Sequence, residues 1–463
     1  MRYISTRGGI EPLQFQDAVM MGLARDGGLL LPEALPTIDA DVLDRWQHLP
    51  YQYLAKEVLA LFIDDIPEHD LEELIERAYA TFAHPQVTPV CQQGEVYILE
   101  LFHGPTLAFK DVALQLLGNL FEYVLARSGG FMNILGATSG DTGSAAIAGV
   151  RGKSNINIFI LHPHGRTSPI QALQMTTVLD PNVFNIAVRG TFDDAQSIVK
   201  AIFNDLAFRD RYRLGAVNSI NWARVLAQVV YYVYAYLKLR KLGNDSVDFS
   251  VPTGNFGDIF AGYVARTLLP PGCIQTLILA TNANDILTRF VNQGQYGRGQ
   301  VVATSSPSMD IQIASNFERY LYYLRGENGA AVKADMEGFA ASGQLDLSAF
   351  KDRVARDFRS RSVSEEETIA TIGEFHRQYG YLLDPHTAVG VKAALELRDP
   401  ARPVICLATA HPAKFGAAVT RAIGSEPPLP PALAELASRD SRCAVLDANE
   451  AAVKDFVAAN ALQ

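Results

Sequence analysis

The feature that most constrains the fold is a repeated order of apolar strand, polar loop and helix, which begins near Val96. Residues 96–101, 131–135 and 156–161 are apolar runs of strand length, and a helical spacing of apolar residues follows each of them. Because parallel strands need a long crossover, usually a helix, this order predicts open parallel sheets covered by helices. Further strands are expected at 183–188, 247–251, 274–280 and 404–407, and helices at 112–125, 170–179, 193–204, 222–239 and 259–269.

The length of the chain predicts more than one domain. A chain of 463 residues is too long for a single compact core. The stretch before residue 90 has a helical apolar repeat and no cluster of reactive side chains, so we expect a mostly helical N-terminal region. The predicted division is 1–90 for that region, 91–135 with 215–463 for a large α/β domain, and 136–214 for a small one.

Charge and cysteine content exclude several classes of protein. The formal net charge of −10 argues against a nucleic-acid binder, which needs a basic face for the phosphates. The four cysteines form no CxxC pair, so neither a zinc site nor any other metal site is predicted, and a reducing compartment fits. The first residues lack a signal-peptide pattern, and no apolar run is long enough to span a membrane. A soluble cytoplasmic protein is therefore expected.

Three polar or glycine-rich loops, at 138–143, 253–258 and 409–415, each follow an apolar strand and precede a helix. Ligands of open α/β sheets bind at the carboxyl ends of the strands, so three such loops at one edge are expected to form a crevice. The loop at 253–258 suits a phosphate, because its glycines let the backbone approach and helix N-terminal N–H groups bind anions. Asp258 is expected to turn away from the anion and cap the helix.

Lys110 is the candidate nucleophile. It follows an apolar run and a Gly-Pro turn, directly before a predicted helix. Burial and the positive end of the helix both lower the pKa of a lysine amine, which frees the amine to form a Schiff base with an aldehyde cofactor. A neighbouring carboxylate, Asp111, acts in the opposite direction if it lies close. A solvated surface lysine is the competing interpretation.

Several segments together resemble the threonine synthases, pyridoxal-phosphate enzymes of fold type II, in their longer bacterial and fungal branch. The matching segments are FHGPTLAFKD (102–111), ATSGDTGSA (137–145), GRTSPIQ (165–171), NSINWARVLAQ (218–228), SVPTGNFGD (250–258), ATNANDI (280–286) and TAHPAKF (409–415). The resemblance implies an α/β fold with two open parallel-sheet domains and a mostly helical N-terminal region. It also implies that Lys110 holds pyridoxal phosphate covalently, that Thr409 meets the pyridine nitrogen, and that the cofactor phosphate binds to Gly254, Asn255, Phe256, Gly257 and Asp258.

The same resemblance implies the conversion of O-phospho-L-homoserine and water to L-threonine and phosphate. It assigns Thr138, Ser139 and Thr142 to the substrate carboxylate, and Asn218, Ser219 and Arg224 to the substrate phosphate. Arg166 and Ser168 are further substrate candidates, although GRTSP could simply cap the following helix. Asp141 stands where many relatives in the wider fold have Asn, and it is expected to cap a helix.

Three other functions stay open at this point. A serine or threonine dehydratase of the same fold would lack the residues that bind a substrate phosphate. A non-catalytic homologue would be expected to lose Lys110, Thr409 or the 254–258 loop. A nucleotide-dependent dehydrogenase would carry GxGxxG, and this loop does not. The expected partners are one small-molecule substrate, no nucleic acid and no membrane, with the chain acting as a monomer or homodimer.

Overall fold

The computed structural model describes residues 1–463, which form two compact units. The larger unit contains 1–76, 82–103 and 219–427, and the smaller unit contains 77–81, 104–218 and 428–463. Each unit is built around an open, mostly parallel sheet, so the predicted α/β class is confirmed. No helix of the chain has the length and apolar character needed to cross a membrane.

The larger unit has a six-stranded sheet in the order β13-β10-β9-β14-β4-β3. Its strands are β3 (Val90–Gln93), β4 (Val96–Glu100), β9 (Val247–Pro252), β10 (Ile274–Thr281), β13 (Phe358–Ser362) and β14 (Val404–Ala408). All neighbours are parallel except β3, which pairs antiparallel with β4 at the edge. Cys406 of β14 stands opposite Ile98 of β4 and Ser250 of β9, so the three strands end at the same edge.

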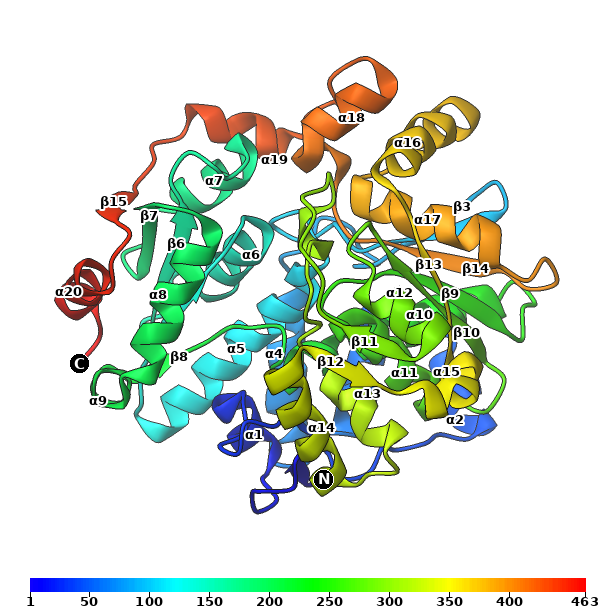
Figure 1. Cartoon of the computed structure of the whole chain (residues 1–463), viewed down its shortest axis with the longest axis horizontal. Helices are drawn as coiled ribbons and strands as arrows, with labels where there is room; N and C mark the ends of the chain where they lie inside the picture. Colours follow the sequence, from blue (N-terminus) through cyan, green and yellow to red (C-terminus); the bar gives the residue numbers. More distant parts are fainter. The chain divides into compact units, whose positions relative to one another are not determined.

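Helices surround this sheet (Figure 1). They are α10 (Trp222–Arg240), α11 (Gly257–Leu268), α12 (Ile286–Gln293), α13 (Phe317–Leu324), α14 (Gly329–Ser342), α15 (Lys351–Asp357), α16 (Glu365–Tyr379), α17 (Pro385–Leu397) and α18 (Gly416–Ile423). The S-x-x-E spacing of Ser364 and Glu367 predicts a capping box at the start of α16, and the structure confirms it, since each side chain bonds the other residue's backbone N–H group. A short hairpin of β11 (Gln295–Gly297) and β12 (Gln344–Asp346) completes the set.

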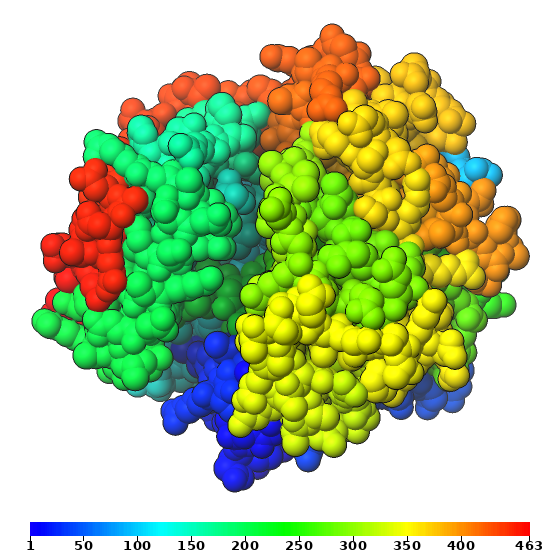
Figure 2. All heavy atoms as spheres, in the orientation of Figure 1, coloured from blue at the N-terminus to red at the C-terminus, as the bar shows by residue number.

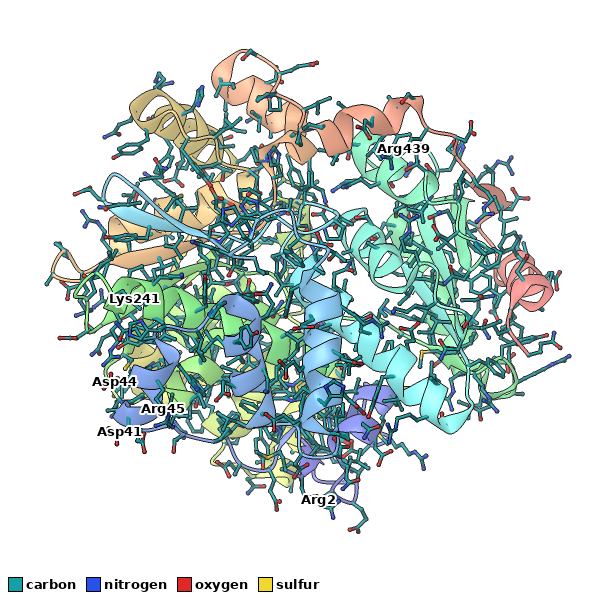
Figure 3. The ribbon with its side chains drawn as sticks, turned by 180° about the vertical axis from the view of Figure 1, so that it is seen from behind. Arg2, Asp41, Asp44, Arg45, Lys241 and Arg439 are labelled. Carbon is teal, nitrogen blue, oxygen red and sulfur yellow. The ribbon has the colours of Figure 1, made fainter.

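The N-terminal region is mostly helical, as predicted. It contains α1 (Phe15–Met21), α2 (Ala40–Trp46), α3 (Tyr51–Ala60), α4 (Glu68–Tyr79) and an antiparallel pair, β1 (Tyr3–Ser5) with β2 (Leu30–Pro32). Helix α3 packs on α10, where the rings of Tyr51 and Tyr234 lie 5.1 Å apart. Helix α2 reaches the end of α10 through Asp44, whose carboxylate is 2.6 Å from an Arg240 nitrogen; Figure 3 shows Asp44 near Lys241.

The smaller unit has a five-stranded parallel sheet in the order β15-β7-β6-β5-β8. The strands are β5 (Met132–Ala137), β6 (Ile156–Pro163), β7 (Val183–Arg189), β8 (Leu214–Gly215) and β15 (Ala444–Asp447). Its helices are α5 (Lys110–Ser128), α6 (Asp141–Val150), α7 (Pro169–Thr176), α8 (Phe192–Asn204), α9 (Leu206–Arg211), α19 (Pro431–Ala434) and α20 (Glu450–Asn460). Helices α8 and α20 bury apolar side chains against Phe159 and Leu161 of β6. Helix α6 packs on the opposite face, against Ile160.

The three polar loops at 138–143, 253–258 and 409–415 do not follow one sheet, because β5 pairs with β6 and β8, whereas β9 and β14 pair with each other in the larger unit. The prediction that all three lie at one edge is therefore wrong. The C-terminal stretch supplies β15 and α20 to the smaller unit, and α20 lies on that unit's surface (Figure 2). The predicted domain boundaries themselves stay a prediction.

Candidate active site

Lys110 is the first residue of α5, which begins two residues before the helix predicted at 112–125. The residue is buried, with 8% of its surface exposed, and the amine lies 5.0 Å from the centre of the Phe109 ring. The Nζ atom is also 3.8 Å from a carboxylate oxygen of Asp141. A carboxylate at this distance favours the protonated form of an amine. The structure therefore places a carboxylate beside the Lys110 amine at this point of the smaller unit.

Asp111 fastens the turn that precedes Lys110. Its two carboxylate oxygens accept hydrogen bonds from the Thr106 backbone N–H (2.8 Å) and the Thr106 hydroxyl (2.7 Å). A Cβ atom at Gly104 would lie 2.4 Å from the Asp111 Cβ, so this turn can form only with glycine there. Asp111 thus orients the start of α5 through the turn.

Asp141 is the first residue of α6 and does not cap it, so that prediction is wrong. The cap comes from Thr138, whose hydroxyl oxygen accepts the Gly140 N–H (3.0 Å) and the Gly143 N–H (2.9 Å). This leaves the Asp141 side chain available for Lys110 on one oxygen and for the amide of Gln171, 2.8 Å away, on the other.

The predicted substrate residues of the smaller unit differ in burial and in contacts. Ser168 caps α7 by accepting the Gln171 N–H (3.3 Å), and its hydroxyl donates to the Gln171 side-chain oxygen (3.0 Å). Ser168, Gln171, Asp141 and Lys110 thus form one continuous polar chain. Among the remaining candidates, Thr142 is half-buried, and the exposed ones are Ser139, Arg166 and Asn218.

The 254–258 loop connects β9 to α11 in the larger unit. Phe256 has φ +65°, its buried ring packs on Phe317, and no side chain caps the first turn of the helix. A Cβ atom at Gly254 would lie 2.7 Å from the Ser308 carbonyl oxygen, so the backbone requires glycine there. An uncapped helix start preceded by glycine suits a phosphate, because the backbone N–H groups bind it directly. The residues present therefore fit a cofactor phosphate.

Asp258 is buried and does not cap α11, contrary to the prediction. One of its carboxylate oxygens accepts hydrogen bonds from the hydroxyls of Tyr231 and Tyr232, the latter at 3.0 Å. Burial raises the pKa of Asp258 to about 6, and the two tyrosine hydrogen bonds act against this rise. These tyrosines are core residues whose hydroxyls also direct a carboxylate away from the loop.

Thr409 follows β14 and is held by a network that the sequence reasoning missed. Its backbone N–H donates to the Thr387 hydroxyl (3.2 Å), which in turn donates to Asp384. Asp384 also accepts the Nδ1–H of His386 (2.8 Å), whose Nε2 accepts the Ser308 N–H (3.2 Å). Because Ser308 lies against Gly254, the buried Asp384 carboxylate orients both Thr409 and the Ser308 backbone beneath the 254–258 loop. The Asp-Pro-His sequence at the start of α17 was the feature of the sequence that could have indicated this network.

The remaining candidates of the larger unit are Ser219 and Arg224. The Ser219 hydroxyl is 3.0 Å from the Ser315 hydroxyl, which is 3.2 Å from the side-chain oxygen of Asn255. The structure thus brings Ser219 to the 254–258 loop. Arg224, on α10, has only 4% of its surface exposed, and this burial lowers its pKa to about 10. A buried guanidinium is a strong site for an anion.

Three family descriptions match the chain. "Threonine synthase N terminus" matches residues 2–79, "Pyridoxal-phosphate dependent enzyme" matches 83–407, and "Threonine synthase, C-terminal" matches 387–457. A threonine synthase of Pseudomonas aeruginosa is 52% identical, over 99% of this chain and 98% of that protein. One of Schizosaccharomyces pombe is 46% identical, over 91% of this chain and 89% of that protein.

Solved structures give the same result. The crystal structure of threonine synthase from Brucella melitensis with bound pyridoxal phosphate is 47% identical, with a TM-score of 0.97 and full coverage of both chains. The yeast threonine synthase structure is 43% identical, with a TM-score of 0.95, and covers 99% of this chain and 98% of that one.

The Asp258 environment predicts a change in the pH dependence of stability. Its pKa is raised from 3.8 to about 6, so the folded protein holds a proton that the unfolded chain has lost. This stability contribution is full below about pH 4 and is lost as the pH rises through about 6. Asp258→Asn keeps an oxygen acceptor for both tyrosines and does not titrate. Its melting temperature minus that of the wild type should therefore rise between about pH 4 and pH 7.

Thermal melts of both proteins across this range, in the absence of added ligand, provide the measurement. The exposed Asp193 supplies a matched control, since Asp193→Asn removes a carboxylate that has no buried tyrosine partners. Parallel melting curves for Asp258→Asn and the wild type would contradict the assigned environment.

Proposed function

This chain belongs to the threonine synthase family of pyridoxal-phosphate-dependent enzymes, and we propose that it converts O-phospho-L-homoserine and water to L-threonine and phosphate. The observation that carries this proposal is the buried Lys110 amine at the start of α5, 3.8 Å from Asp141. The lysine stands in the segment by which the chain resembles this family. The threonine synthases of Pseudomonas aeruginosa and Schizosaccharomyces pombe align with this chain over 99% and 91% of its length.

The proposed cofactor residues are Lys110, the 254–258 loop and Thr409. Lys110 provides the amine for covalent attachment, and the loop provides N–H groups for the phosphate. When bound, pyridoxal phosphate withdraws electrons from the bonds at the substrate's α carbon. Thr409 offers the ring nitrogen a hydroxyl. A hydroxyl stabilises a positive ring less than a carboxylate does, which restrains side reactions.

The proposed role of Lys110 after the substrate has bound is proton transfer. Its amine takes and returns protons at the α, β and γ carbons of the substrate, as general base and acid. The Asp141 carboxylate, 3.8 Å from the Nζ atom, attracts the ammonium group that the acid steps use. Gln171 holds the other Asp141 oxygen at 2.8 Å, which fixes the carboxylate in the orientation that this task requires.

The substrate has two anionic ends, and the proposed residues differ accordingly. Arg224, Ser219 and Asn218 bind the phosphate, with the buried Arg224 guanidinium as the main cation. The carboxylate binds at the start of α6, where the candidates are Thr138, Ser139 and Thr142. The hydroxyl oxygen of Thr138 already caps this helix, so Thr138 acts there mainly by shaping the loop. Arg166 and Ser168 are kept as outer candidates, since Ser168 caps α7.

A cytoplasmic location and a monomeric or homodimeric state complete the proposal. All four cysteines are free, which suits a reducing compartment.

The activity and the role of Lys110 are tested together. Purified wild-type protein should release phosphate from O-phospho-L-homoserine and form L-threonine, and it should show the visible absorption of protein-bound pyridoxal phosphate. Lys110→Ala should lose that absorption and about 10³-fold in rate, because the attachment point and the proton-transfer group are removed together.

The control is Lys153→Met, which changes a second buried lysine of the smaller unit, bonded to Glu122 at 2.7 Å. It should keep the absorption band. A wild-type protein that stays colourless after incubation with pyridoxal phosphate would refute the proposed function. A wild-type protein that releases no phosphate from O-phospho-L-homoserine or from a close analogue would refute it too.

Arg224→Gln should raise the KM for O-phospho-L-homoserine by about 10- to 100-fold, because a charge-assisted hydrogen bond contributes about 1.5–3 kcal/mol. Cofactor absorption should survive, since Arg224 is proposed to bind the substrate and not the cofactor. Steady-state phosphate release at varied substrate concentration gives the KM. Arg224→Lys, which keeps the charge, should fall between the two proteins. An unchanged KM in both variants would remove Arg224 from the substrate site.

A further inference from the structure

Arg319 on α13 is a buried cation whose hydrogen bonds go to neutral oxygens. It has 0% of its surface exposed. Its guanidinium donates to the carbonyl of Leu30 (2.8 and 3.0 Å), to the carbonyl of Ile220 (2.6 Å) and to the side-chain oxygen of Asn316. Burial lowers its pKa to about 9. A buried charge is costly, and a full set of hydrogen bonds offsets only part of that cost.

Asn316 connects Arg319 to the 254–258 loop through hydrogen bonds. Its backbone N–H donates to the Asn255 carbonyl (3.0 Å), and its side-chain amide donates to the carbonyls of Asn255 and Ser219 (both 3.2 Å). Because Arg319 engages the amide oxygen of Asn316, the NH₂ group must face those two carbonyls. Arg319 therefore fixes the orientation of the Asn316 amide.

The captured Asn255 carbonyl determines where the next N–H points. In a trans peptide the C=O and the following N–H point in opposite directions. Holding the Asn255 carbonyl on the α13 side therefore directs the Phe256 N–H to the other side of the loop. A free carbonyl could rotate toward an anion and repel it. A fixed one leaves an N–H donor in place before the anion arrives, which reduces the ordering cost of binding.

The same helix also connects the loop to the N-terminal region. Glu318 accepts hydrogen bonds from the Thr6 hydroxyl (2.6 Å) and, on both oxygens, from the Arg7 guanidinium (2.9 Å each). Arg319, the next residue, binds Leu30 of β2. Since the Arg7–Glu318 pair is neutral as a whole, the positive charge of Arg319 is left to act on anions bound nearby.

We propose that Asn316 and Arg319 are positioning residues for the phosphate group of the cofactor, acting through the backbone of the 254–258 loop. Through Leu30 they also make the N-terminal region a contributor to cofactor affinity. This inference rests on the proposed function, which assigns the loop to that phosphate. Neither side chain is required to touch the cofactor.

The first test is Asn316→Ala. Apo-protein is titrated with pyridoxal phosphate and, separately, with pyridoxal, which lacks the phosphate. The variant should lose about tenfold or more in affinity for pyridoxal phosphate, which is the effect expected for one or two buried hydrogen bonds. Its affinity for pyridoxal should stay near that of the wild type. A general loosening of the fold would weaken both ligands equally, and that outcome, like an unchanged affinity for both, overturns the proposal.

The second test separates Arg319 from the rest of α13. Arg319→Lys keeps the charge but cannot make four hydrogen bonds, so it should also lose affinity for pyridoxal phosphate selectively. The matched control is Arg325→Lys at the end of the same helix, which breaks a two-bond pair with Asp335 (2.7 and 2.8 Å). This control should lower the melting temperature and leave the phosphate-selective affinity unchanged. An equal loss of affinity for pyridoxal phosphate in the Arg319 and Arg325 variants contradicts the inference.

Hydrogen exchange in the apo-protein gives a readout without any ligand. The backbone N–H of Asn316, which donates to the Asn255 carbonyl (3.0 Å), should exchange faster in Arg319→Lys than in the wild type, whereas the amides of α16 should not change. Equal exchange of the Asn316 amide in both proteins counts against the proposal. If the wild type and the variants bind pyridoxal phosphate equally well, only this inference is refuted. Wild-type protein that fails to bind it refutes the proposed function as well.

Discussion

The parallel register of β4, β14 and β9 decides where the polar groups of the larger unit can act. Strands β9 and β14 are buried and end level with β4, so Thr253 and Thr409 leave the sheet at one edge. The polar groups that hold Thr409 and the 254–258 loop depend on this edge. Asp384 orients Thr409 through Thr387, and the uncapped start of α11 follows β9 directly. A one-residue slip in register would turn each of these groups to the other face of the sheet.

Uncharged neighbours help to orient three of the charged groups, of which Asp141 also faces the Lys110 amine. Tyrosine hydroxyls hold Asp258, a glutamine amide holds Asp141, and backbone carbonyls with an asparagine hold Arg319. A neutral partner fixes the direction of a charge without cancelling it. Such charges keep their ability to attract or repel an ionic ligand, which full ion pairs would lose. This suits a protein whose proposed cofactor and substrate both carry phosphate.

Short-range features were predictable from the sequence, and long-range partners were not. The helix start at Lys110, the capping box at Ser364 and the strands that precede the loops follow from spacing within a few residues. The roles of Asp258 and Asp141 were predicted wrongly, because their partners lie 27 and 30 residues away on other helices. The contact between Thr6 and Glu318 spans 312 residues, and no local pattern reports it. Family resemblance supplied the function, the cofactor and the candidate roles, which spacing alone left open.

The position of β15 affects how the chain folds during synthesis. Strands β5, β6 and β7 are made early, yet β7 gains its second neighbour only when residues 444–447 appear, and α20 then covers Phe159 and Leu161. Until that moment the nascent smaller unit exposes an open strand edge beside an apolar surface, which is the combination most prone to pair with other chains. The last part of the smaller unit to be made thus protects the first.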